Sequence, residues 1–197
     1  MSILKNKYFF FCFLFLPFIN CTVKFSKKSP NFLSKINSTK RIVIHIDKKS
    51  LLRKKESEIL YDITKELISH HKEFIVYPEP ENFEGKCDPN SPKMEGILNV
   101  LLIQKIENEE IFLSEIISLR NCLNETEIIW EAQGKDSFPM KSEENESLRK
   151  TYTQKYGREI EYAVNPYFLL TKIILEKLDS PELTEDEKDE KIDIESQ

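Results

Sequence analysis

The chain has 197 residues, of which 40% are hydrophobic and 32% charged, and its formal net charge at pH 7 is −5. This length suits one domain with a proper core and leaves little room for two. An acidic chain without a basic folded face is a poor candidate for nucleic-acid binding, so we expect no nucleic-acid partner.

The first twenty residues have the layout of an export signal. Lys5 and Lys7 precede an almost unbroken apolar stretch from Tyr8 to Ile19. A charged start followed by an apolar core of about 7 to 15 residues is typical of a secretory signal peptide, whereas a membrane-spanning helix needs about 20. We therefore predict that residues 1–20 are a signal peptide.

The signal ends at a cysteine. The run Phe18-Ile19-Asn20-Cys21 resembles a bacterial lipoprotein box, in which the cysteine becomes the acylated, palmitate-bearing first residue of the mature chain. Phe18 and Asn20 replace the usual leucine and small residue, a relaxed form that is similar to the boxes of spirochaete lipoproteins. The resemblance implies that Cys21 is the lipid attachment site and that the bilayer is a partner. The alternative is an ordinary signal peptide cut elsewhere.

Two polar segments flank the expected domain. Residues 21–40 carry five lysines and no acids, which predicts a flexible basic tether after the lipidated Cys21, with ends roughly 25 Å apart. Residues 181–197 are strongly acidic, and although Thr184 and Glu187 have capping-box spacing, few apolar residues follow them. We expect this segment to be a solvated tail.

Residues 41–180 read as a single domain whose first third is a crossover unit. Isoleucines alternate with other residues from Arg41 to Asp47, the period of a half-buried strand. Ser50 offers an N-cap for a helix that reaches about Lys72, and residues 74–77 form a second strand. Two strands joined by a helix should run parallel.

The rest of the domain reads as three strands and two helices. Residues 97–106, 111–122 and 127–133 are strand patterns separated by tight turns, which favours an antiparallel meander. Ser142 can cap a polar helix, and Asn165-Pro166 is a good start for an apolar helix up to Leu178. The pattern predicts an α+β fold: a mixed sheet of about five strands with helices packed on one face.

Two cysteines remain after the signal and Cys21 are set aside. An exported domain permits a disulfide, so we predict a bond between Cys87 and Cys122 that closes a loop of about 35 residues, worth about 3 to 4 kcal/mol in the chain-entropy model. The alternative is two free buried thiols. No histidine lies near either cysteine in the sequence, and no spacing resembles a zinc-ligand cluster.

The histidines and carboxylates predict no catalytic site. His70 and His71 are adjacent on a helix, so their side chains point about 100° apart and do not form the one-face pair of a metalloprotease. His45 alternates with the isoleucines and should face away from them. We predict no catalytic residue, no metal site and no cofactor.

Several short motifs add a resemblance at the level of a family. They are Glu95-Gly96-Ile97-Leu98, Arg120-Asn121-Cys122 leading to Glu127-Ile128-Ile129-Trp130, and the run Tyr162 to Leu170, with Pro181 to Thr184 and Glu190 to Ile192 near the end. With the cysteine-ended signal, this layout is similar to a small family of predicted lipoproteins from spirochaetes and myxobacteria. That family implies no activity. The resemblance therefore bears only on the location in the envelope and on the presence of a single domain.

These observations predict a role in the bacterial envelope. The leading hypothesis is a non-enzymatic interaction or accessory module with an envelope protein as its partner. It is lipid-anchored at the outer membrane, and we favour the periplasmic face over the cell surface. The second hypothesis places the domain on the cell surface, where it binds external or host molecules. An envelope hydrolase is the third.

Overall fold

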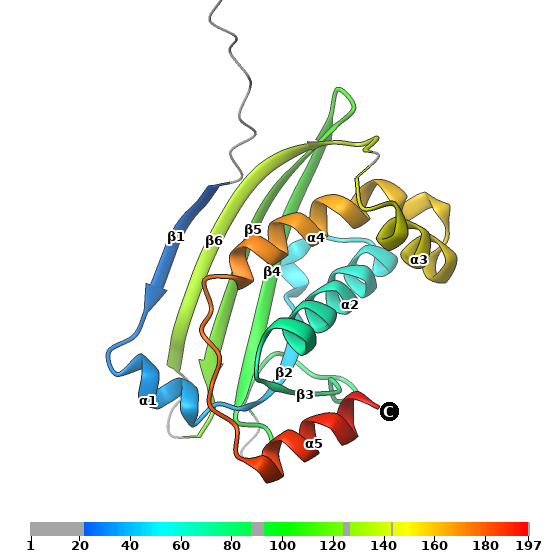
Figure 1. The fold of residues 1–197 in the computed structure, drawn as a ribbon. Coiled ribbons are helices and arrows are strands. Elements are labelled where there is room, and N and C mark those ends of the chain that lie inside the picture. The colour runs from blue at the N-terminus through cyan, green and yellow to red at the C-terminus, as the bar shows by residue number, and fades with distance from the viewer. Residues whose placement is uncertain (1–21, 88–92, 124–126, 143, 197) are drawn as a thin grey trace, which may run out of the picture.

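The computed structural model describes residues 22–87, 93–123, 127–142 and 144–196. In this part of the chain a six-stranded mixed sheet carries helices on one face, which confirms the predicted α+β fold with one strand more than expected (Figure 1). The strand order is β1-β6-β5-β4-β2-β3. The strands are β1 (Thr22–Lys28), β2 (Arg41–Ile46), β3 (Ile75–Tyr77), β4 (Gly96–Glu107), β5 (Glu110–Asn121) and β6 (Glu127–Pro139).

The crossover unit is present, but its helix starts later than predicted. β2 runs parallel to β3 on one side and to β4 on the other, and α2 (Lys54–His71) makes the connection. Ser50 is not the N-cap: it lies in the short 3-10 helix η1 (Lys48–Ser50), and its Oγ accepts a hydrogen bond from the backbone N of Leu102 at 3.1 Å. Because Ser50 is held by the sheet, α2 begins only after Arg53.

The meander is antiparallel as predicted. β4 pairs with β5 and β5 with β6 along their whole lengths, and the two hairpins bring Leu102, Glu115 and Gly134 opposite one another. Directly opposed residues share one face of a sheet. The face of the sheet that α2 and α4 cover is called the inner face below, and the opposite face the outer face.

The apolar helix of the last third begins a turn earlier than predicted. After α3 (Glu146–Tyr156) and the 3-10 turn η2 (Arg158–Ile160), α4 runs from Glu161 to Leu175 with Pro166 inside it. Asn165 therefore is no N-cap; it is buried and its Oδ1 accepts a hydrogen bond from Asn145 Nδ2 at 2.5 Å. Pro166 removes one intrahelical bond, a loss that the packing of the remaining helix offsets.

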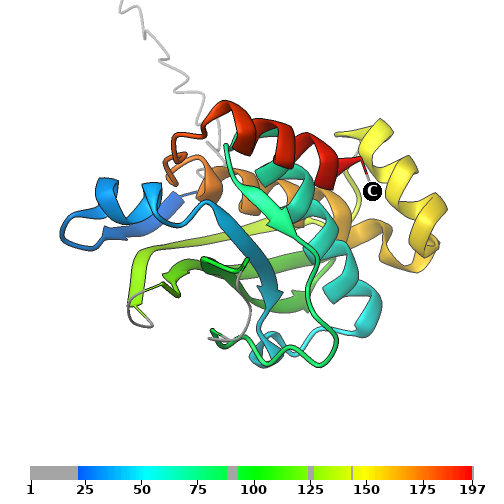
Figure 2. The ribbon, with the colours of Figure 1, turned by 90° about the horizontal axis from the view of Figure 1, so that it is seen from below.

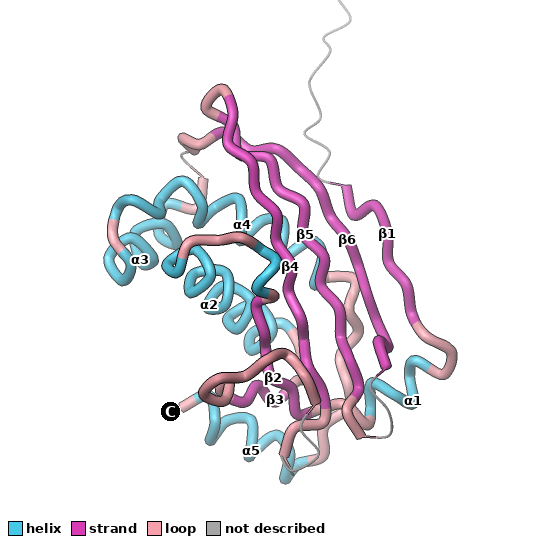
Figure 3. Tube along the Cα trace, turned by 180° about the vertical axis from the view of Figure 1, so that it is seen from behind, coloured by secondary structure: helices cyan, strands magenta, loops and turns pink. Residues whose placement is uncertain are grey.

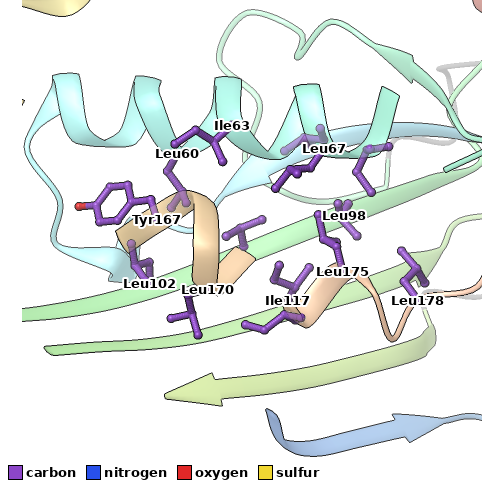
Figure 4. Packing of buried hydrophobic residues seen from close by; sticks show 14 of the residues in the cluster. Leu60, Ile63, Leu67, Leu98, Leu102, Ile117, Tyr167, Leu170, Leu175 and Leu178 are labelled. Atoms are coloured by element: carbon purple, nitrogen blue, oxygen red, sulfur yellow. The ribbon is translucent and has the colours of Figure 1, made fainter. Parts of the chain in front are cut away.

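The main core fills the space between the inner face and the two long helices. Figure 4 shows side chains of α2, α4 and the central strands meeting there. Among the buried residues are Leu60, Ile63, Leu67, Leu98, Leu102, Ile117, Tyr167 and Leu170. A second, smaller cluster lies on the outer face beside β2 and contains Val43, Met94 and Ile97.

The expected flexible tether is an ordered part of the sheet. β1 pairs antiparallel with β6, and α1 (Phe32–Asn37) follows with Phe32 and Ile36 buried one turn apart. The prediction was wrong because it weighed the lysines and not the alternation of Val23 and Phe25. Lysines are common on edge strands, where they discourage pairing with another chain.

The expected solvated tail is a docked helix. α5 (Glu185–Glu195) starts at the Thr184 capping box and lies beside β3 at the edge of the sheet (Figure 2). It buries no residue, but Lys40 Nζ lies 2.7 Å from Glu187 and Arg41 Nη2 lies 2.6 Å from Glu190. Ion pairs to the start of the domain therefore hold this helix, which an apolar pattern cannot reveal.

Candidate binding groove

A groove lies at the edge of the sheet, where β2 extends beyond the end of β3. β3 pairs only with Arg41 to Val43, while β2 continues to Ile46. The space beyond β3 is a cavity of about 830 Å³ between α2 and the segment 78–84. It is lined by His45, Ile46, Lys48, Ser57, Glu58, Tyr61, Asp62, Pro78, Glu79, Pro80, Asn82, Phe83, Glu84 and Tyr156.

One wall of the groove is the polar side of α2. Glu58 and Asp62 are four residues apart and so share a helix face, and Tyr61 lies beside them. Asp62 also receives hydrogen bonds from Tyr156 Oη and Lys155 Nζ, both at 2.5 Å, which dock the end of α3 on α2. Burial raises the pKa of Tyr61 above its usual value, so its hydroxyl stays protonated and polar in the wall.

The other wall is a loop fastened around His45. The Nδ1 atom of His45 lies 2.6 Å from Glu79 Oε1, and the ring meets Phe83 edge-on with centroids 5.4 Å apart. The residue is 7% exposed. As expected from the alternation, it faces away from the isoleucines of β2. Its contacts with Glu79 and Phe83 hold the loop against β2.

Gly85 completes the enclosure of this imidazole. A Cβ atom at Gly85 would lie 2.6 Å from Cδ2 and 2.8 Å from Nε2 of His45, and the φ angle of Gly85 is +70°. The glycine backbone therefore rests against the second nitrogen while Glu79 holds the first. These contacts fix the His45 ring in the wall of the groove, a geometry that suits a structural histidine.

The other predicted residues fall into three groups. His70 and His71 line two different hollows near the end of α2, away from His45, and do not meet each other. Cys87 and Cys122 form a disulfide with Cα atoms 5.4 Å apart, which closes the loop beside the small outer cluster. Cys21 lies outside the described residues.

Two buried carboxylates were not predicted as special. Burial raises the pKa of Glu56, but hydrogen bonds from Arg53 and Tyr162 outweigh it and hold the pKa at about 2. Burial raises the pKa of Glu115 to about 8, and the bond from Thr171 offsets only part of that rise. Glu115 alternates with Leu113 and Ile117 in β5, so its inward position was readable from the sequence.

Neither of these groups belongs to the groove. Glu56 helps to cap α2, and Glu115 lies under α4 in the middle of the sheet. In the described part of the chain, no group of three or more histidine, cysteine or acidic side chains is arranged to hold a metal ion. Within the same residues, every helix is too short or too polar to span a bilayer.

The similarity of this chain to known proteins is a similarity of fold. No protein-family model matches the chain, and no curated protein matches it either. Two structures of the PelC dodecamer from Paraburkholderia phytofirmans, one of them a single-substitution variant, are similar with TM-scores of 0.56 and 0.54 at 12% and 13% identity. They match 81% and 82% of this chain and 99% of each PelC chain, so the likeness extends over nearly the whole PelC fold.

A minor lipoprotein from Acinetobacter baumannii is a more distant neighbour. It is 13% identical, its TM-score is 0.27, and the match covers 74% of this chain and 98% of that one. At such a score we draw nothing from it about this chain.

Proposed function

We propose that this chain is a bacterial lipoprotein, anchored through Cys21, that acts as a non-enzymatic interaction module of the cell envelope. The predicted export signal and its cysteine support a location in the envelope. The resemblance to predicted lipoproteins of spirochaetes and myxobacteria supports the same location. The outer membrane, on its periplasmic side, is the location we propose. A protease that cannot enter intact cells should leave the protein whole until the envelope is opened.

The observation that carries the interaction role is the chemistry of the groove. Four carboxylates line it, and they are Glu58, Asp62, Glu79 and Glu84; Lys48 is the lysine of the lining. Lys155 and Lys86 pair with Asp62 and Glu84 from beside the groove and balance part of this charge. Tyr61, Phe83 and two prolines add apolar surface. Arginine and lysine pair with carboxylates and stack on aromatic rings, so the groove suits a basic, extended segment of a partner protein.

The walls are preorganised for such binding. α2 packs on the main core, and the loop is held by the His45–Glu79 contact and by the Cys87–Cys122 disulfide. A site whose walls are already ordered loses less conformational entropy when a partner binds. His45 fits the same role, because its contacts with Glu79 and Phe83 stabilise the wall.

A photo-crosslinking residue at Tyr61 tests the proposal in living cells. We expect a defined crosslinked product that disappears in the Glu58→Lys/Glu84→Lys variant, because charge reversal repels a basic segment. The Glu176→Lys variant, which changes an exposed acid just after the end of α4 and outside the groove, is the matched control and should keep the product. A crosslink that is unchanged by reversal in the groove, or no crosslink at all, would rule out this partner chemistry.

A further inference from the structure

The pairing of β1 fixes where residue 22 sits on the domain. Thr22 lies opposite Lys135 of β6, which lies opposite Ser114 of β5, which in turn lies opposite Ile103 of β4. This row crosses three gaps between strands of about 4.8 Å each, so Thr22 and Ile103 are about 15 Å apart. Cys21 is joined to Thr22 by one peptide bond, and consecutive Cα atoms are about 3.8 Å apart.

Apolar side chains gather on the outer face around this row. Ile103 is 55% exposed, Phe25 43% and Phe112 40%. The register shows that they share the outer face: Phe25 lies opposite Gln133, Phe112 opposite Lys105, and Ile103 is two residues from Lys105 on the same strand. Their neighbours Leu102 and Leu113 point the other way, into the main core.

Two lysines complete this surface, which we call the anchor patch: Phe25, Ile103, Lys105, Phe112 and Lys135. A hollow of about 520 Å³ lies among Ile103, Phe112 and both lysines. Figure 3 shows that no helix of the described chain covers this end of the outer face. Lys105 also pairs with Glu107 at 2.6 Å, and Asp136 lines the same hollow. The patch therefore combines exposed apolar groups, two lysines and a nearby proposed point of lipid attachment.

We propose that the anchor patch lies against the surface of the bilayer, with the phenylalanines and Ile103 among the headgroups and Lys105 and Lys135 at lipid phosphates. Apolar side chains framed by lysines are the signature of a surface that rests at a membrane interface. Lysine stems lie along apolar surface while their charged ends reach outward, so they fit the same orientation.

The register of β1 is what selects the bilayer over other occupants. A tether of 19 residues would let the domain leave the membrane, whereas an acyl group one residue before a paired strand keeps the patch at the surface. This inference rests on the proposed acylation of Cys21. It adds the face that the domain presents to the membrane and leaves the groove, at the edge beyond β3, free for a partner.

Brominated lipids test the orientation in the full, acylated chain. The protein is reconstituted in vesicles of phosphatidylcholine and phosphatidylglycerol with and without bromine on the acyl chains. Phe112→Trp places an indole in the patch, and Leu33→Trp and Ile192→Trp place one on α1 and α5, at the opposite end of the domain (Figure 1). The native Trp130 is fully buried and gives a constant background.

We expect brominated lipid to quench the added emission strongly in Phe112→Trp and almost not at all in the two control variants, because apolar groups of an interfacial surface reach the acyl boundary. If brominated lipid quenched the added emission equally at all three sites in vesicle-bound protein, the proposed orientation would be wrong, although the anchor would remain intact. An indole that is shielded but unquenched, with crosslinks between copies at this face, would show that a second copy covers the patch and would also overturn it. Protein that does not float with vesicles would instead refute the anchor itself.

Discussion

Glu115 should make the stability of this protein fall as the pH rises. Its side chain is fully buried, and its only hydrogen-bond partner in the described residues is Thr171 Oγ1, at 2.9 and 3.1 Å from the two carboxyl oxygens. Burial raises its pKa from 4.5 to about 8. Between these values the folded chain holds a proton that the unfolded chain has lost, so raising the pH favours unfolding.

The size of the effect follows from the pKa. Each pH unit above 4.5 costs about 1.4 kcal/mol until the folded carboxyl ionises, so about 3 kcal/mol of stability is lost by pH 7. The full contribution is present below pH 4.5 and is gone above pH 8. Glu115→Gln keeps the shape and the bond to Thr171 but carries no charge, so at pH 7 we expect it to be more stable than the wild type by up to about 3 kcal/mol.

Urea unfolding at pH 5, 6, 7 and 8 measures this difference. The gap between Glu115→Gln and the wild type should widen steadily from pH 5 to pH 8. Glu110→Gln, an exposed change on the same strand, is the control and should follow the wild type at every pH. A constant gap for Glu115→Gln would mean that the buried carboxyl is already ionised at pH 5, and the reasoning from burial would fail.

Three further perturbations address other parts of the structure. Cys122→Ser opens the loop and should cost about 3 to 4 kcal/mol in urea unfolding, and an unchanged midpoint would exclude a disulfide in solution. Gly85→Ala places a methyl group against the His45 ring at a residue with positive φ, so it should lower the free energy of unfolding by about 1 to 3 kcal/mol and shift the His45 proton resonances. A variant as stable as the wild type would contradict the close packing of Gly85 on the ring. Arg41→Met removes the ion pairs of Arg41 with Glu187 and Glu190 of α5, so hydrogen exchange of α5 amides should speed up about tenfold. Unchanged protection would mean that other contacts hold the helix.

The parts of the fold that were predictable are those with local periodic patterns. The strand around Ile44, the helix that follows it and the meander all show apolar spacing that matches their burial, so the sheet and its helix-covered face were expected. Helix starts were less accurate. Ser50 and Pro166 both satisfy helix-start rules, but contacts with the sheet and with the preceding turn moved the real boundaries.

Long-range contacts explain what was missed at both ends of the domain. β1 depends on β6, more than a hundred residues later in the chain, and α5 depends on Lys40 and Arg41. Neither partner is visible in a local window of sequence. The groove was missed for the same reason: the outward position of His45 was predicted, but the loop that brings Glu79 and Phe83 to it has no period to read.

Mass spectrometry of the mature amino-terminal peptide is the decisive experiment for the proposed lipid anchor. We expect this peptide to begin at Cys21 and to carry the mass of attached acyl chains. We expect Cys21→Ala to remove that mass and to release the protein from membranes. A mature chain that begins at another residue, or an unmodified Cys21 in membrane-associated protein, would contradict the anchor and the orientation derived from it.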